Sequence, residues 1–330
     1  MDTDIERKSI TILKILAESN GPLGARIVSR MLEEEGIHLT ERAVRFDLQF
    51  MDERGLTRNV GKKGRAGRVI TDKGRDELSN ALVSDKIGMI AGRIDELSYQ
   101  TNFDLETKSG NVILNVSLIR KSEFQKAMDI VKEVSEAGIC LSRSVLIAEP
   151  GQELGHLTVP DGMVALGTLC SVTINGILLH HRIPLKSRFG GILQIGKSGP
   201  RRFTQIIEYS SSSLEPAEIF LKGKMTSVLD AARSGAGEVL AGFREIPVAC
   251  LPEARDILGR LEQIGISGTV FIGKPNQPTL QIPVNSGYAG LVILAGINPL
   301  AAVEETGIDT QNTSLSMIMD FQKLVPLFQC

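Results

Sequence analysis

Apolar residues in the first third of the chain recur at the three- and four-residue spacing of amphipathic helices. This spacing predicts helices over residues 4–19 and 24–35, ended by Asn20-Gly21 and by Gly36. Each helix would turn one apolar stripe toward a shared core. The pattern therefore predicts a small helical unit at the start of the chain.

A third apolar stripe consists of Val44, Leu48 and Met51. Thr40 precedes it with a hydroxyl that can cap a helix start, and Gly55 follows it with the backbone freedom that helix ends require. We expect a third helix between these two positions. Its two aromatic residues, Phe46 and Phe50, are predicted to complete the core.

After the third helix, the segments LTRNV and RVITDKG flank the glycine-rich run GKKGRAG. This pattern predicts a β-hairpin with a basic tip. Thr71 is placed to cap a closing helix that reaches about Val83. Helices followed by a hairpin and a further helix are typical of a winged helix-turn-helix domain, which we assign to residues 1–83.

Polar residues on the third helix and the hairpin point to double-stranded DNA. Residues 57–75 contain seven Lys or Arg and a single acid, Asp72. In a winged helix, the third helix enters the major groove and the hairpin contacts phosphates. Each feature alone is equally typical of a solvated helix face or a mobile loop, but their combination favours DNA binding. The predicted contacts are Arg42, Arg45, Gln49, Lys62, Lys63, Arg65 and Arg68.

Residues 84–100 form a further amphipathic pattern, with Ile87, Ile90, Ile94 and Leu97 at helical spacing. We predict a connecting helix. Its apolar stripe would either lie between two subunits or pack on the domain that follows it, and the sequence favours neither.

The remaining chain contains an internal repeat. AMDIVKEVSEAGIC at 127–140 matches ARDILGRLEQIGIS at 254–267, and the segments starting at Ser144 and Thr269 match next. Further matches pair Gly167 with Gly290 and Ile174-Asn175 with Ile297-Asn298. The alignment needs two small gaps, one between the first and second matches and one between the second match and these later ones. The repeat predicts a duplicated α+β domain at 101–330 with copies at about 112–225 and 239–330. We expect the two copies to face each other across a cleft.

Two long apolar runs, at 163–179 and 289–303, are interrupted by Ser, Thr, Asn, Gly or Pro. They are too short and too interrupted to span a membrane, so we predict buried strands. The first copy also has an extra segment, 180–213, which is rich in arginine and contains His180 and His181. Adjacent residues on a strand point to opposite faces, so these two histidines are not expected to bind one metal. The extra segment is either part of a ligand site or an edge hairpin.

Composition narrows the class of function. The net charge is −2, so positive charge is local to the hairpin rather than general. The four cysteines lack the paired spacing of zinc or redox sites, which predicts free thiols in a reducing cytoplasm, and no signal peptide is expected. The chain shows no nucleophile elbow, zinc-protease motif, phosphate loop or dinucleotide fingerprint. We therefore predict no catalytic residues, no metal and no cofactor. An enzyme with a DNA-binding head and an RNA-binding adaptor are the alternatives.

The head, with TILKILAESNGPLGARIVSRML and LTERAVRFDLQFMDERGL, resembles archaeal nitrogen-regulatory repressors of the NrpR family. The segments EPGQELGHLTVPDGMVALGTLCSVTINGILL and FGGILQI resemble the family's regulatory domain. The resemblance implies a repressor of nitrogen-assimilation and nitrogen-fixation genes that 2-oxoglutarate releases from its operator. It also implies a homodimer or higher oligomer, and it allows a second NrpR-type chain as a partner.

A dicarboxylate effector requires arginine, hydroxyl or amide groups to hold its oxygens. The first copy supplies such groups beside glycine turns, and a cysteine at the end of its helix becomes a serine in the second copy. The cysteine is either a pocket residue or a small buried hydrophobe. The predicted effector-binding residues are Cys140, Arg143, Asn175, Arg182 and Arg188.

Overall fold

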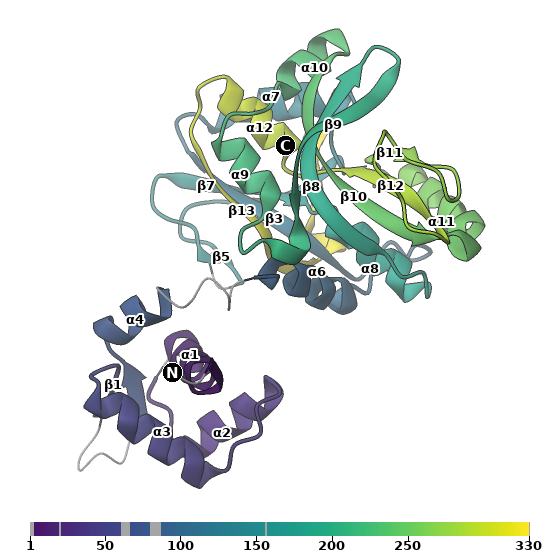
Figure 1. Cartoon of the computed structure of the whole chain (residues 1–330). Helices are drawn as coiled ribbons and strands as arrows, with labels where there is room; N and C mark the ends of the chain where they lie inside the picture. The colour runs from purple at the N-terminus through teal and green to yellow at the C-terminus, as the bar shows by residue number, and fades with distance from the viewer. Residues whose placement is uncertain (1–2, 20, 61–66, 80–86, 156, 330) are drawn as a thin grey trace. The chain divides into compact units, whose positions relative to one another are not determined.

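The protein is represented by a computed structural model that describes residues 3–19, 21–60, 67–79, 87–155 and 157–329 (Figure 1). Contacts divide the chain into two compact units, residues 1–87 and 88–330. We call them the head and the regulatory unit. The helix over 89–100 belongs to the regulatory unit.

The head contains three helices, a two-stranded antiparallel sheet and a closing helix. Thr40 accepts a hydrogen bond from the Ala43 amide at the start of the third helix, and Thr71 accepts one from the Gly74 amide (3.0 Å) at the start of the last. Both caps confirm the hydroxyl rule for helix starts. The elements are α1 (Thr3–Glu18), α2 (Ala25–Glu34), α3 (Glu41–Glu53), β1 (Thr57–Val60), β2 (Gly67–Ile70) and α4 (Asp72–Ser79).

The head core is built from the predicted apolar stripes, and Val44, Leu48 and Met51 are buried in it. The prediction for the two aromatic residues of α3 is wrong, since Phe46 is 72% exposed and Phe50 is 38% exposed. Both lie on the side of α3 that faces away from the buried stripe.

Two glycines fix how the hairpin joins the helices. Gly67 has a φ of +107°, and a Cβ there would lie 2.6 Å from the Leu23 backbone, which forms a bridge with Arg68. A Cβ on Gly74 would lie 2.1 Å from the Leu56 carbonyl oxygen. The hairpin and α4 therefore approach the rest of the head more closely than a side chain would allow.

The regulatory unit begins with α6 (Met89–Gln100), and two similar series of elements follow it. The first series is β3 (Asn111–Arg120), α7 (Phe124–Glu136), β4 (Ser144–Ala148), β5 (Glu153–Leu154), β6 (Leu157–Thr158), β7 (Met163–Leu169), α8 (Val172–His180), β8 (Lys186–Gly196), β9 (Gly199–Glu208), the 3₁₀ turn η2 (Tyr209–Ser211), α9 (Pro216–Lys222) and α10 (Val228–Ser234). The second series is β10 (Gly237–Pro247), η3 (Val248–Cys250), α11 (Leu251–Gln263), β11 (Thr269–Ile272), β12 (Tyr288–Leu294), α12 (Asn298–Glu305), β13 (Thr310–Asp320), η4 (Phe321–Lys323), β14 (Val325–Pro326) and η5 (Leu327–Gln329).

The two copies exchange their last strands. One five-stranded antiparallel sheet has the order β13-β3-β7-β4-β14, and the other has the order β11-β12-β10-β8-β9. We call them the first and second sheets. Strand β8 of the first copy pairs with β10, whereas β13 of the second copy pairs with β3. Each sheet thus contains strands of both copies, and the duplicated α+β architecture is confirmed in an intertwined form.

Part of the interface between the copies is a filled hydrophobic core. One buried cluster combines Leu114 and Leu169 of the first copy with Ile246, Leu291 and Ile293 of the second. The main chain also joins the copies, because the Ser267 amide donates to the Leu141 carbonyl at 2.7 Å. The strand exchange buries this surface. A groove lined by Val116 and Leu118 of the first copy and by Met317 of the second lies elsewhere between the copies, as the cleft prediction expects.

The strand pairing also corrects the alignment of the repeat. Leu169 pairs with Leu114, and Leu294 pairs with Ala241, so the equivalent residues of β7 and β12 are 125 positions apart. The side chain of Thr173 bonds the backbone of Ile113, and that of Asn298 bonds the backbone of Leu240. Asn298 is therefore the counterpart of Thr173. The second gap, which paired Asn298 with Asn175, is wrong.

The two long apolar runs each contain a strand and a helix, not one strand. Residues 163–169 and 288–294 are strands, but α8 and α12 follow them. Seven consecutive residues of α8, 172–178, are buried, so no polar stripe marks its helical period. His180 ends α8 and His181 follows it, which corrects their placement on a strand.

The connecting helix α6 packs on its own regulatory unit. Ile94 and Leu97 are buried in a cluster with Cys170, Val172 and Tyr209. Ile87 and Met89, at and just before its start, remain more than half exposed. No described helix combines the length and apolar character of a membrane span.

Candidate DNA interface and effector site

Helix α3 presents a polar stripe on the side opposite its buried residues. Arg42 and Gln49 are exposed on this stripe, and neither forms a side-chain hydrogen bond or ion pair with another described residue. Arg45 is also exposed, and its guanidinium bonds Glu41 one turn earlier. The three predicted helix contacts are therefore accessible on one side of the head.

Arg68 has a different environment from the other predicted DNA contacts. Its Nε donates to Asp52 Oδ2 at 2.8 Å, and only 14% of its side chain is exposed. The other oxygen of Asp52 accepts from Thr57 Oγ1 at 2.6 Å. Arg68 thus joins the hairpin to α3, and its contact with DNA stays a prediction. Lys62, Lys63 and Arg65 lie outside the described residues.

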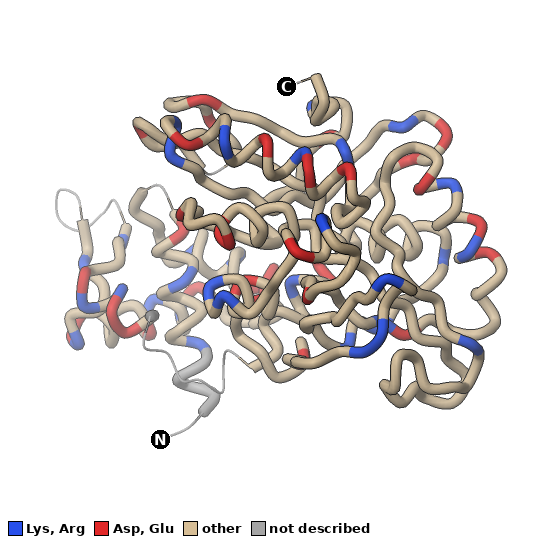
Figure 2. Tube along the Cα trace, turned by 90° about the horizontal axis from the view of Figure 1, so that it is seen from above, with Lys and Arg blue, Asp and Glu red and all other residues tan. Residues whose placement is uncertain are grey.

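Charge in the regulatory unit is distributed differently from the head sequence. Figure 2 shows acidic and basic residues interspersed along the chain. Many of them pair locally, as Arg233 does with Glu133 and Lys121 with Glu149. Exposed charge therefore does not mark a ligand site in this unit, and the buried charged residues are the better candidates.

The strongest such feature is Arg244 on β10, which is only 1% exposed. Its Nε donates to Asn175 Oδ1 at 2.6 Å, and its Nη2 donates to Ser171 Oγ at 2.9 Å. Its Nη1 is buried and has no hydrogen-bond partner among the described residues. Burial lowers the pKa of this guanidinium, because taking a charge out of water is costly.

Three buried titratable residues, Tyr209, Cys170 and Glu215, surround Arg244. Burial raises the pKa of Tyr209 and raises the pKa of Cys170 to about 12. Burial also raises the pKa of Glu215 to about 7, and a hydrogen bond from the Ala217 amide opposes this rise. A Cβ on Gly242 would lie 2.7 Å from Arg244 Nη1 and 3.2 Å from the Tyr209 hydroxyl. Because Gly242 has no side chain, Arg244 Nη1 and the Tyr209 hydroxyl have room beside it.

Arg188 lies on β8 and is already paired with Glu245 of β10. Its Nη1 donates to Glu245 Oε1 at 3.1 Å and to the Pro283 carbonyl at 2.7 Å. Glu245 is fully buried and also accepts from the amide and side chain of Asn285. Arg188 therefore neutralises a buried carboxylate and holds the loop before β12.

The remaining predicted effector residues are scattered. Cys140 is buried near the Ser135 carbonyl, and burial raises the pKa of its thiol. Arg143 is exposed near the ring of Phe328, and Arg182 is exposed after α8. Of the five predicted residues, the structure brings only Asn175 into contact with the Arg244 cluster, which comprises Arg244, Ser171, Asn175, Cys170, Tyr209 and Glu215.

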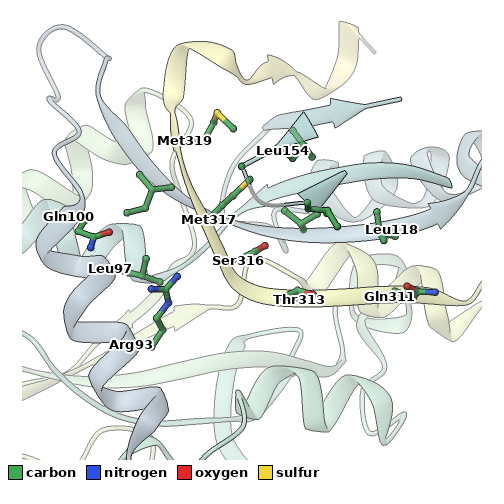
Figure 3. A pocket seen from close by; sticks show the side chains of 14 residues that line it. Arg93, Leu97, Gln100, Leu118, Leu154, Gln311, Thr313, Ser316, Met317 and Met319 are labelled. Carbon is green, nitrogen blue, oxygen red and sulfur yellow. The ribbon is translucent and has the colours of Figure 1, made fainter. Parts of the chain in front are cut away.

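A groove of about 610 Å³ lies on another side of α6 (Figure 3). Helix α6 contributes Arg93, Leu97 and Gln100, while β13 supplies Gln311 and Met317. The pairing of β13 with β3 is interrupted between Thr313 and Met317, beside this groove. No predicted effector residue lines the groove.

Sequence reasoning missed Arg244 although a signal was present. The segment EVLAGFREIPV is otherwise apolar in its centre, so adjacent charges at Arg244 and Glu245 are unusual in a buried strand. Their partners come from far along the chain, which hides their roles from the sequence. Among the described residues, no group of three or more potential His, Cys, Asp or Glu ligands could hold a metal.

A winged-helix head on a duplicated α+β unit defines a transcription regulator, and comparisons with known proteins agree. The NrpR regulatory domains NRD1 and 2 match residues 87–326, and the ribonuclease R winged-helix domain matches residues 10–78. The chain belongs to the NrpR family of nitrogen regulators.

The similar proteins include the global nitrogen regulator NrpRI of Methanosarcina mazei, which is 37% identical over 98% of this chain and 99% of its own. The global nitrogen regulator NrpR of Methanocaldococcus jannaschii is 30% identical over 97% of this chain and 55% of its own. A crystal structure of a nitrogen repressor-like protein from Methanococcus jannaschii has a TM-score of 0.61 and 29% identity. It covers 72% of this chain and 97% of that one.

Proposed function

We propose that this protein is a cytoplasmic repressor that binds operator DNA of nitrogen-assimilation and nitrogen-fixation genes and is released by 2-oxoglutarate. The observation that carries the DNA-binding half is the exposed stripe of α3 with Arg42 and Gln49. A single winged head covers few base pairs, so we propose that a homodimer binds two half-sites about one helical turn, or a multiple of it, apart. A second NrpR-type chain is a further proposed partner.

The Arg244 cluster is the proposed place for a carboxylate of the effector. A buried guanidinium nitrogen without a partner is stabilised by an anionic ligand, and the Tyr209 hydroxyl lies on the same side of Gly242. In this role Arg244 replaces Arg188, whose charge is already balanced by Glu245.

The cluster is also connected to the head through one helix. Tyr209 and Val172 pack on Ile94 and Leu97 of α6. Helix α6 is the first helix of the regulatory unit after the head. A ligand that moved α8 or Tyr209 would move α6, and it would release DNA only if it binds better to that arrangement.

The test is calorimetry of the whole chain with 2-oxoglutarate, followed by operator release. Arg244→Met should lower ligand affinity about tenfold or more, since a charge-assisted hydrogen bond contributes about 1.5–3 kcal/mol. Its ligand-free operator affinity should remain, because Arg244 lies on β10 of the regulatory unit and not on α3.

Gln311→Ala in the groove is the matched control and should bind the ligand normally. Loss of binding in Gln311→Ala with normal binding in Arg244→Met would place the effector in the groove. No heat with the unaltered protein would reject 2-oxoglutarate as its effector.

A further inference from the structure

The most exposed phenylalanine of the described chain lies in the middle of the proposed DNA-contacting face. Phe46 is 72% exposed. It follows Arg42 by four residues and precedes Gln49 by three and Glu53 by seven, so these four side chains form one stripe along α3.

Helix geometry explains why Phe46 cannot reach the core. It is two residues from Val44 and two from Leu48, which places it about 200° around the axis from both. Phe50 differs, because its ring is partly covered by the Arg54 guanidinium at 4.2 Å from the ring centre. Phe46 has no comparable ring contact among the described residues.

The surrounding chemistry identifies what this ring contacts. Scattered exposed apolar residues are ordinary, but this one is flanked by Arg42, Arg45 and Gln49 on a helix followed by a basic hairpin. Positive charge beside the ring complements a phosphate backbone rather than an apolar protein surface. The major groove presents one apolar group, the C5-methyl of thymine.

We propose that Phe46 reads a thymine through contact with its methyl group, and so adds a specificity-determining residue to the DNA interface. This inference rests on the proposed DNA binding by α3. A contact of Phe46 with a thymine methyl group would also make the protein prefer DNA to duplex RNA. Duplex RNA lacks this methyl group, and its deep, narrow major groove excludes side chains.

Replacing thymine by uracil removes only the methyl and keeps base pairing, which makes it a direct probe. We would first select a duplex that the whole protein binds. In a series of duplexes, one thymine position is then replaced by uracil in each half-site, a different position in each duplex. At one position, the unaltered protein should lose about fourfold in affinity per half-site, comparable to the burial of one methyl group. Phe46→Ala should bind thymine and uracil duplexes equally.

Two variants separate this contact from general weakening. Arg42→Ala should bind less tightly but keep the same thymine-to-uracil ratio as the unaltered protein. Phe46→Leu should retain part of the ratio, because leucine is still apolar. The salt dependence of binding should be the same for Phe46→Ala and the unaltered protein, since no phosphate contact is removed. Circular dichroism should show an unchanged fold, as expected for an exposed side chain.

The outcomes distinguish this inference from the function on which it rests. If no duplex is bound with sequence preference, the proposed repressor function fails. If duplexes are bound but Phe46→Ala keeps the full thymine-to-uracil ratio, DNA binding stands and the Phe46 contact is wrong. A Phe46→Ala variant that dissociates into monomers in sedimentation, with its thymine-to-uracil ratio intact, would assign the ring to a protein interface.

Discussion

Single residues in this protein acquire roles from partners that are distant in sequence. Arg188 is the clearest case, since sequence analysis assigned it to the effector whereas the structure pairs it with the fully buried Glu245. Glu245 keeps two hydrogen bonds from Asn285 when the arginine is removed, but it loses its counterion. The consequence is a prediction about stability rather than about ligand binding.

Arg188→Ala should destabilise the regulatory unit by about 1–3 kcal/mol, because it leaves a buried carboxylate without its charged partner. Denaturant unfolding measures the loss. The double variant Arg188→Ala with Glu245→Gln should recover part of it, since glutamine carries no charge. Equal stability of Arg188→Ala and the unaltered protein would show that the pair contributes nothing to the fold.

Glu215 gives the regulatory unit a dependence on pH. Its folded pKa of about 7 lies above its ordinary value, so the folded state binds more protons between those two values. The stability that this proton provides is present below about pH 4.5 and is lost as pH rises through 7. Glu218 raises this pKa further and Arg244 lowers it.

Glu215→Gln should therefore remove a fall in stability between about pH 5 and 7. The fall should be about 1–3 kcal/mol, because one pKa unit is equivalent to about 1.4 kcal/mol and this side chain keeps part of its surface in water. Unfolding curves at several pH values test it. Parallel pH profiles for Glu215→Gln and the unaltered protein would contradict it.

At the scale of elements, close packing of α6 on α8 depends on one glycine. A Cβ on Gly176 would lie 2.4 Å from the Thr101 Cβ and 2.7 Å from the Ser98 carbonyl oxygen. The backbone of α8 therefore approaches the end of α6 directly. Under the proposed release of DNA by a ligand, this contact would couple α8 to the helix that follows the head in the chain.

Gly176→Ala should push α6 away from α8 and destabilise the regulatory unit by about 1–3 kcal/mol. Gly92→Ala within α6 is the matched control, because nothing lies within 4 Å of a Cβ at that position. That control should instead stabilise the helix by about 0.5–1 kcal/mol. Chemical unfolding measures both variants. A change of stability in the same direction for both would contradict the role of Gly176 in the packing of α6 on α8.

At the scale of the whole molecule, strand exchange makes the two copies depend on each other. The first sheet needs β13 beside β3, and the second sheet needs β8 beside β10. Separating the copies would also expose the core that Leu114 and Leu169 share with Ile246 and Leu291.

Residues 88–225 and 226–330, produced separately, should therefore each fail to fold cooperatively. Produced together, they should reassemble into a complex with the circular dichroism spectrum of residues 88–330. Sharp, independent thermal transitions of either fragment would show that the copies are self-sufficient despite the exchange.

What the sequence determined by itself is local and periodic. Val44, Leu48 and Met51 predicted the buried face of α3, and Thr40 and Thr71 predicted two helix starts, because a helix repeats every 3.6 residues and its cap is a near neighbour. The matching segments predicted the duplication, since each copy encodes the same elements.

The tertiary structure decided what depends on distant partners. Residues 172–178 are buried throughout, so no exposed polar stripe reveals that they form a helix. The exchange of β8 and β13 depends on pairing with strands of the other copy, which lie far away in the sequence. Arg188 and Arg244 are alike as side chains, but Arg188 pairs with Glu245, whereas one nitrogen of Arg244 has no hydrogen-bond partner among the described residues. The periodicity of a chain specifies its elements, whereas the neighbours of a charge depend on the completed fold.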